Sequence, residues 1–291
     1  MIKRTARIAL ILVGAVLLVM TLALVWLKVH EDELVFAAAI SRQHLLTTLP
    51  ADAEVTAVPI AKSPDLAGLL FHADTAVDNG FWILQLHGNA DSAFSRWQVR
   101  HCEGLRESGF NVLEVDYRGF GRSPGQPSES AMYEDAEAAY QLLLQRGVAA
   151  NRIIILGHSL GSGPAVRLAS RHPAAALVLF GAFTSIPDAA ADRYPYLPVR
   201  LAVAIQFNSL ARIRDVHMPI VIAHSRADSL IPYSHALKLY DAANDPKRLI
   251  TFDTPSKDGF GGHVDALFEH VNALQAALAD VVPGFPPPRA Q

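Results

Sequence analysis

Short apolar runs alternate with longer amphipathic stretches along most of this chain. Runs of aliphatic, often β-branched residues, such as residues 153–156 and 220–223, predict strands buried on both faces. The stretches between them, such as residues 128–145, carry apolar positions at helical spacing. This alternation predicts an α/β protein with a mostly parallel, doubly wound sheet of about eight strands. The first two strands, near residues 54–60 and 66–72, look antiparallel.

The alternation is interrupted by a segment with several prolines and aromatic residues, at about residues 184–215. An apolar stretch near residues 199–207 predicts a short helix inside it. We interpret the segment as a small cap over the site. The alternation then resumes until a last helix, whose apolar face is predicted to contain Val264, Leu267, Phe268, Val271 and Leu278. Residues 283–291 form a Pro-rich tail, which we expect to be disordered.

The most apolar stretch lies near the N-terminus, where residues 8–27 contain no charge. As a helix, this stretch would span about 30 Å, the thickness of the hydrocarbon core of a bilayer. Basic residues precede it, and three acidic residues at positions 31–33 follow it. We therefore expect an uncleaved, single-pass membrane anchor. The charge bias predicts a cytoplasmic N-terminus and places the remaining chain on the far, periplasmic or lumenal, side.

Two other interpretations of the N-terminal stretch stay open. A secretory signal peptide would be removed, but the run is longer than usual and no small-residue cleavage site closely follows Leu27. A helix buried in the core of a soluble domain is the second alternative. With an anchor, the chain divides into the anchor at residues 1–30, a juxtamembrane linker at 31–50, an α/β domain at 51–282 that includes the cap, and the tail at 283–291.

Composition excludes several classes of function. The formal net charge is −3 and no basic cluster lies beyond the first residues, which argues against nucleic-acid binding. A single cysteine, Cys102, excludes an internal disulfide and a cysteine-rich metal site. Cys102 lies in a stretch with helical periodicity, so we expect a packed structural thiol. The sequence has no cluster of His, Asp, Glu or Cys at metal-ligand spacing, so neither a metal nor another cofactor is implied.

The motif with the clearest chemistry lies at residues 157–161, Gly-His-Ser-Leu-Gly, directly after a predicted strand. It fits the G-x-S-x-G nucleophile elbow, a sharp turn between a strand and a helix. The two glycines avoid collisions between side chains around such a turn. The turn would expose the hydroxyl of Ser159 beside the N-terminus of the next helix. An ordinary glycine-rich turn is the alternative that the motif alone leaves open.

A serine hydroxyl becomes a nucleophile only with a base that takes its proton and a carboxylate that orients this base. In chains with this elbow, the acid and then the histidine follow the serine, each after a later strand. Asp228 follows such a strand, and His263 follows two glycines before the last helix. Asp253 is the runner-up for the acid, whereas Asp215 precedes its strand and lies at the wrong end. We predict that Ser159, His263 and Asp228 are catalytic.

The tetrahedral intermediate of acyl transfer carries an oxyanion that needs two N–H donors. One donor is expected from Leu160, the residue after the predicted nucleophile. The other is expected from the loop at residues 87–90, where Asn89 is the preferred donor and Ala90 is the alternative. We expect His87, in the same loop, to be a structural residue that bonds local backbone.

These motifs make the chain resemble the α/β-hydrolase superfamily. Within it, the chain looks most like the membrane-anchored serine hydrolases that include lysophospholipid and monoacylglycerol lipases and protein depalmitoylases. The resembling motifs occur in family order, at residues 87–90 (HGNA), 116–123 (DYRGFGRS), 157–162 (GHSLGS), 196–199 (YLPV), 207–210 (FNSL), 224–228 (HSRAD) and 261–263 (GGH). The resemblance implies an α/β-hydrolase fold and a Ser-His-Asp triad, but this fold hosts many substrates.

The resemblance and the expected anchor together imply a serine hydrolase of the esterase, lipase or thioesterase type. It would cleave carboxylic ester or thioester bonds through an acyl-enzyme, on lipid-like acyl substrates near a membrane. The implied partners are such a small acyl substrate and the membrane lipid around the N-terminal helix, with no nucleic acid. Two alternatives remain. One is a catalytically silent, membrane-tethered binding protein with the same fold, and the other is a serine peptidase of that fold.

Overall fold

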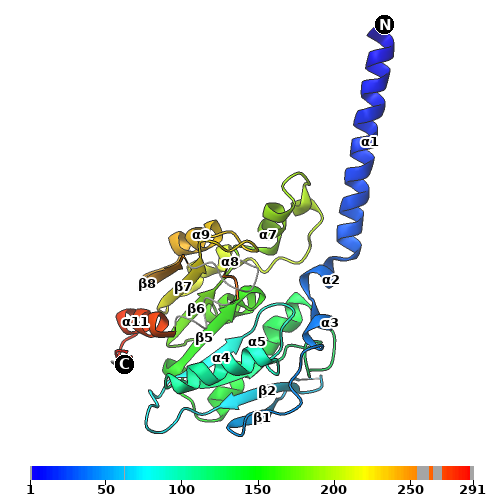
Figure 1. Cartoon of the computed structure of the whole chain (residues 1–291). Helices are drawn as coiled ribbons and strands as arrows, with labels where there is room; N and C mark the ends of the chain where they lie inside the picture. Colours follow the sequence, from blue (N-terminus) through cyan, green and yellow to red (C-terminus); the bar gives the residue numbers. More distant parts are fainter. Residues whose placement is uncertain (1, 62, 254–261, 265–270, 289–291) are drawn as a thin grey trace.

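The computed structural model of the chain describes residues 2–61, 63–253, 262–264 and 271–288. Its strands form one eight-stranded sheet in the order β1-β2-β4-β3-β5-β6-β7-β8 (Figure 1). They are β1 (Ala53–Val58), β2 (Leu66–Phe71), β3 (Trp82–Leu86), β4 (Asn111–Val115), β5 (Ile153–His158), β6 (Ala176–Phe180), β7 (Ile220–Ser225) and β8 (Lys247–Phe252). Strand β2 pairs antiparallel with β1 and β4, and all other neighbours pair parallel. The predicted fold class, including the antiparallel start, is confirmed.

Helices cover both faces of the sheet. The described residues form the α-helices α1 (Ile2–Val29), α2 (Glu31–Val35), α3 (Ala38–Ser41), α4 (Arg96–Glu107), α5 (Glu129–Gln145), α6 (Ser162–Ala169), α7 (Ile186–Arg193), α8 (Ser209–Arg212), α9 (Ser234–Ala242) and α11 (Val271–Val281). Of these, α1 lies away from the sheet (Figure 1). Successive residues of a strand point to opposite faces. Thus Ile155 of β5 belongs to the core cluster that contains Tyr140 of α5, and Ile154 belongs to the cluster that contains Cys102 of α4. Cys102 is buried, as predicted.

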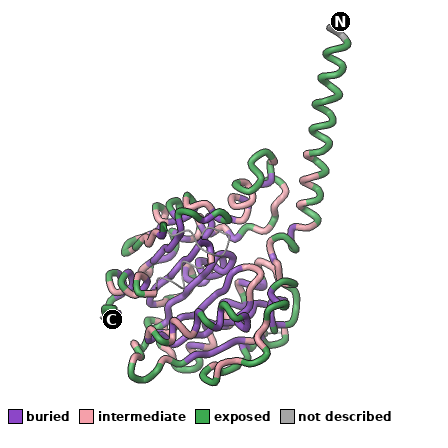
Figure 2. Tube along the Cα trace, viewed as in Figure 1, coloured by how far each residue is buried: buried purple, intermediate pink, exposed green. Residues whose placement is uncertain are grey.

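The central strands are the most deeply buried part of the molecule (Figure 2). All residues of β4, β5 and β6 are buried, which explains the apolar runs at residues 153–156 of β5 and throughout β6. Strand β4 also buries the polar residues Asn111 and Glu114. Side chains fix where the covering helices begin. Ser128 Oγ accepts a hydrogen bond from the N–H of Ala131 at 3.1 Å and so caps α5. Because β5, β6, β7 and β8 pair parallel, their carboxyl ends lie at the same edge of the sheet. The predicted catalytic residues follow β5, β7 and β8 at this edge.

Helix α1 projects away from the domain (Figure 1). Its segment Arg4–Val29 is long and apolar enough to cross a membrane, and none of its most apolar window is buried. The helix is therefore not part of the core. The linker behind it does pack on the domain. Phe36 is 4% exposed and belongs to the main core cluster, and its ring lies 6.2 Å from that of Phe207 in an edge-to-face arrangement.

The prediction of a helix at residues 199–207 is wrong. Only a 3-10 turn, Val199–Leu201, forms there, and the α-helices of the cap segment are instead α7 and α8. Four consecutive backbone N–H groups, at residues 204–207, donate to carboxylates outside the segment instead of to helical carbonyls. Those of 204 and 205 bond to Glu31, and those of 206 and 207 bond to Glu129. Helix α7 begins at Ile186 because the preceding residue, Ser185, caps it. Ser185 Oγ accepts a hydrogen bond from the N–H of Asp188 at 3.1 Å.

The tail is not wholly separate from the domain. Phe285 is 7% exposed, and its ring lies 5.0 Å from that of Phe81 and 5.8 Å from that of Phe110. The prediction of a disordered tail is therefore wrong for Phe285, because its aromatic ring covers apolar surface of the core. The predicted apolar face of the last helix is described only in part. Leu278 is buried as expected, whereas Leu267 and Phe268 lie outside the described residues.

Candidate active site

Strand β5 delivers Ser159 to the edge of the sheet on a strained turn. Ser159 has a φ of 49°, in the left-handed region that side chains other than glycine seldom adopt. Gly161 makes the close approach of neighbouring segments possible. A Cβ atom there would lie 2.1 Å from the carbonyl oxygen of Leu86 and 2.6 Å from that of His87. The chain between β5 and α6 thus has the geometry of the predicted elbow.

The structure brings the three residues predicted as catalytic together. His263 Nε2 lies 2.8 Å from Ser159 Oγ, and His263 Nδ1 lies 2.7 Å from Asp228 Oδ2. In this geometry the hydroxyl can donate to Nε2, while Nδ1–H donates to the carboxylate. All three residues are at most 9% exposed. The runner-up Asp253 lies elsewhere, because its carboxylate is 72% exposed and pairs with Arg226.

Asp228 is held as a carboxylate by several donors. Its Oδ1 accepts hydrogen bonds from the backbone N–H groups of Leu230 and Ile231, both at 2.9 Å. His224 Nε2 lies 3.1 Å from Oδ2, the same oxygen that His263 Nδ1 contacts. Burial raises the pKa of Asp228, but the bonds from the two histidines and from the backbone outweigh it and hold the pKa well below its ordinary value. A carboxylate that stays ionised can orient an imidazole and stabilise its protonated form.

Two histidines of the site were not predicted. His158 Nε2 lies 3.0 Å from the backbone carbonyl oxygen of His263, and His224 Nε2 lies 2.8 Å from that of Ile231. Burial, and secondarily the charge of His263, lowers the pKa of His158 to about 4, so its ring is neutral near pH 7 and donates from Nε2. His224 is the first residue of the HSRAD motif at residues 224–228. Its place at the end of a strand beside β6 was the signal for a supporting role.

The loop after β3 holds the predicted oxyanion donors. Asn89 Oδ1 accepts the N–H of Ala90 at 2.9 Å and also that of Ala37, in the juxtamembrane linker, at 2.8 Å. Ala90 has a φ of 59°. The Ala90 N–H is thus bonded to the Asn89 side chain, and the role of Asn89 as the oxyanion donor stays a prediction. The role of Leu160, which is 3% exposed and lines the same cavity as Ser159, remains a prediction.

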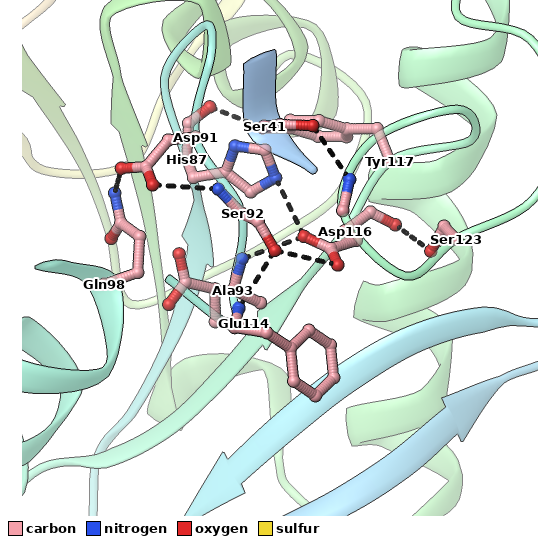
Figure 3. Close-up of polar contacts among 12 residues, drawn as sticks. Ser41, His87, Asp91, Ser92, Ala93, Gln98, Glu114, Asp116, Tyr117 and Ser123 are labelled. Atoms are coloured by element: carbon pink, nitrogen blue, oxygen red, sulfur yellow. Dashed lines mark hydrogen bonds and ion pairs between the residues drawn. The ribbon is translucent and has the colours of Figure 1, made fainter. Parts of the chain in front are cut away.

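A buried carboxylate, Asp116, joins this loop to the next one (Figure 3). It accepts the N–H of Ala93 at 2.8 Å, the N–H of Arg122 at 2.7 Å and the hydroxyl of Ser92 at 3.1 Å. Burial raises the pKa of Asp116, against the opposing influence of His87 and of these bonds. His87 Nε2 lies 3.6 Å from Asp116, and its Nδ1 lies 2.8 Å from the carbonyl oxygen of the next residue. These contacts agree with a structural role for His87.

A cavity of about 270 Å³ lies beside Ser159. Most side chains around it are apolar, and they come from α1, α2, the cap and the loop after β7. The aliphatic side chains that line the cavity include Leu27, Leu34, Val35, Ile186, Val203 and Ile231. Within the described ranges, no group of three or more His, Cys, Asp or Glu side chains is arranged to hold a metal ion. Because its lining is mainly apolar, the cavity can accept an apolar chain next to Ser159, whose hydroxyl is bonded to His263.

Known proteins resemble the chain in sequence and fold. Residues 82–207 match the protein family described as serine aminopeptidase, S33. Rv2307c of Mycobacterium tuberculosis is 37% identical over 205 residues, which cover 70% of this chain and 72% of that protein. The lysophosphatidylserine lipase ABHD12 of Danio rerio is 36% identical over 185 residues, which cover 57% of this chain and 48% of the lipase.

Solved structures show the same architecture. The esterase Pf2001 of Pyrococcus furiosus aligns with a TM-score of 0.66 and 18% sequence identity, over 83% of this chain and 98% of the esterase. At this level of identity the likeness concerns the fold alone. The fold, the sequence relatives and the matching family agree, and the chain belongs to the α/β-hydrolase superfamily.

Proposed function

We propose that the protein is a membrane-anchored serine hydrolase that cleaves ester or thioester bonds of lipid-like acyl substrates. One observation carries the proposal: the ring of His263 is bonded both to Ser159 and to Asp228, beside an apolar cavity. A buried serine with this pair of partners has the groups that acyl transfer requires. The hydrolase class itself follows from the family.

In the proposed reaction, Ser159 Oγ attacks the acyl carbonyl carbon while His263 Nε2 takes the hydroxyl proton. The negative charge that develops on the carbonyl oxygen is stabilised by the N–H groups of Leu160 and Asn89. The tetrahedral intermediate then collapses, the bond to the alcohol or thiol breaks, and the leaving group receives the proton from Nε2. Asp228 keeps the imidazole oriented and stabilises its cationic form. A water molecule, activated by the same histidine, hydrolyses the acyl-enzyme and releases the carboxylic acid.

Two features support a lipid-like substrate. The cavity beside Ser159 is walled mainly by aliphatic side chains, which suit a hydrocarbon chain. The N-terminal helix has the length and composition of a membrane span, which would keep the site close to lipid. The name of the Danio rerio relative, a lysophosphatidylserine lipase, agrees with this substrate class. The charge bias around the helix favours a cytoplasmic N-terminus and a catalytic domain on the far side of the membrane.

The contacts of Glu31 argue against an aminopeptidase. Such an enzyme needs a free carboxylate to bind the ammonium group of a peptide N-terminus. Glu31 lines the cavity, but its carboxylate already accepts bonds from Lys28 and from the N–H groups of Ala204 and Ile205. Among the described residues that line the cavity, there is therefore no free carboxylate for the ammonium group of a peptide.

The test is labelling by a fluorophosphonate probe, which reacts with activated serines, in membranes that contain the full-length wild type or Ser159→Ala. We expect labelling of the wild type and none of the variant. A panel of acyl esters, acyl thioesters and aminoacyl amides then distinguishes the reactions. Labelling that persists in Ser159→Ala would refute the assignment of the nucleophile. A folded wild type that neither reacts with the probe nor turns over any substrate would favour the binding protein.

A further inference from the structure

The cavity beside Ser159 has one wall that does not come from the α/β domain. Leu27 lies near the end of α1, and Leu34 and Val35 lie in α2. These three aliphatic residues line the same cavity as Ile186 and Val203 of the cap. A chain that occupied the cavity would therefore contact the juxtamembrane helix on one side and the cap on the other.

Glu31, the first residue of α2, fastens this wall to the cap. Its Oε1 accepts the N–H groups of Ala204 and Ile205, both at 2.6 Å, and its Oε2 accepts Lys28 Nζ, also at 2.6 Å. The side chain of Glu31 is 8% exposed, whereas that of Lys28 is 50% exposed. Burial raises the pKa of Glu31, but the bonds from Lys28 and the two cap N–H groups outweigh it, so the pKa is lowered and the group is anionic.

Further contacts fix the rest of the linker to the loops around the site. Besides the bond from Ala37 to Asn89, Ser41 Oγ accepts the N–H of Gly121 at 2.9 Å. Arg42 donates to the carbonyl oxygen of Gly119 at 2.6 Å. The linker is thus bonded to the cap, to the loop after β3 and to the loop after β4. Because these hydrogen bonds fix its position against the loops around the site, the linker forms part of the site and is not a flexible connection.

The surfaces on either side of the cavity are apolar and exposed. In the cap, Tyr196 is 92% exposed and Leu201 is 86% exposed. The cap lies on the same side of the domain as α1, whose aliphatic side chains are also exposed (Figure 1). Exposed apolar side chains on both the cap and α1 suit contact with the acyl layer of a bilayer.

We propose that α2 is a wall of the acyl-binding site, that Glu31 is the positioning residue that holds this wall against the cap, and that a single acyl chain enters from the bilayer between them. The inference rests on the proposed hydrolase function. The cap and α2 enclose the acyl chain, so they set the preference for long over short acyl groups. They do not take part in the chemical step at Ser159.

The experiment compares full-length proteins in phosphatidylcholine nanodiscs, with p-nitrophenyl octanoate and p-nitrophenyl acetate as probes. The readout is the ratio of kcat/KM for the two esters. For Glu31→Ala we expect this ratio to fall by about tenfold, through KM for octanoate, because the wall is released. Glu31→Gln keeps an Oε1 acceptor for both cap N–H groups and should restore most of the ratio. Glu33→Ala, an exposed acid in the same helix, is the matched control.

Leu34→Trp tests the wall without touching the bond network. A larger side chain at Leu34, which lines the cavity, should lower the same ratio, whereas Asp32→Trp, at a position outside the cavity lining, should not. Fluorophosphonate labelling verifies that each variant is folded. If Glu31→Ala does not fold, the ratio measured for Leu34→Trp tests the inference alone. Ratios that stay at the wild-type value in Glu31→Ala and Leu34→Trp would overturn the inference. A wild type that is not labelled by the fluorophosphonate and hydrolyses neither esters nor thioesters would instead refute the proposed function.

Discussion

His158 Nε2 donates a hydrogen bond to the backbone carbonyl oxygen of His263 at 3.0 Å. The residue before the proposed nucleophile thus holds the segment that carries the proposed base. The two rings lie 5.4 Å apart, and His158 is 8% exposed. Because a protonated His158 would place a second buried charge beside the proposed base, the site favours its neutral form.

This contact predicts a pH-dependent stability. The pKa of His158 is lowered from 6.5 to about 4 in the folded protein, so between these values the unfolded chain binds a proton that the folded chain does not. Stability is therefore lost as the pH falls through this window. His158→Gln keeps an amide donor and does not titrate. Relative to this variant, the wild type should lose on the order of 3 kcal/mol of unfolding free energy between pH 6.5 and pH 4.

Chemical denaturation of both proteins in detergent micelles, at a series of pH values, measures this difference. Other groups titrate in the same window, but they are shared by the two proteins and cancel in the comparison. An unfolding free-energy difference that does not change with pH would show that His158 is not buried in its neutral form.

Asp228→Asn should nearly abolish turnover while leaving the fold intact. An amide can accept from His263 Nδ1 or donate to it, so the imidazole tautomer is no longer fixed and its cation is no longer stabilised. We expect kcat to fall by roughly a thousandfold or more. Asp253→Asn is the matched control, because this exposed carboxylate follows the next strand and pairs only with Arg226 among the described contacts. Steady-state kinetics with an activated ester compare the two, and equal losses of activity would contradict the assignment.

Gly161→Ala should destabilise the fold strongly, because the added methyl would meet backbone carbonyl oxygens that cannot move aside. We expect a loss of about 3 kcal/mol or more in the free energy of unfolding. Gly104→Ala provides the opposite control. Gly104 lies inside α4 with nothing within 4 Å of an added Cβ, so its replacement should stabilise the protein by about 0.5–1 kcal/mol. Thermal or urea unfolding measures both, and a neutral Gly161→Ala would refute the close approach.

Ala37→Pro should weaken catalysis on short esters. Proline removes the N–H that bonds to Asn89 Oδ1, while the φ of −76° at position 37 suits the ring. The loss of one hydrogen bond behind the proposed oxyanion donor should lower kcat by about three- to tenfold. Ala37→Gly keeps the N–H and should stay closer to the wild type. Equal kcat values for the wild type and the proline variant would show that this contact does not position the loop.

Local sequence signals were enough for a mostly parallel sheet of about eight strands with an antiparallel start, and for the approximate location of most helices. Buried β-branched runs predict the central strands because both faces of these strands are covered, so no polar residue interrupts them. Chain order also sufficed to select Asp228 and His263 from many acidic residues and histidines. The structure brings both to Ser159, and their catalytic roles remain to be tested.

The features that sequence reasoning missed depend on contacts between distant parts of the chain. The expected helix at residues 199–207 is absent because Glu31 and Glu129 accept its N–H groups, and these acids lie far away in sequence. Phe285 looked like part of a disordered tail because the surface it covers is formed by other elements. Side chains that accept backbone N–H groups of a distant segment leave no periodic pattern in the sequence of that segment. The same is true of apolar surface that a distant aromatic ring covers.

Phe207 has a consequence for how the protein unfolds. Its buried ring contacts the ring of Phe36 in the linker and, at 5.5 Å, that of Tyr133 in α5, and it fills the space beside Gly163 in α6. One ring therefore closes three interfaces, and opening any of them exposes the same apolar surface to water. The linker should not melt before the rest of the domain, and calorimetry should record a single cooperative transition for both.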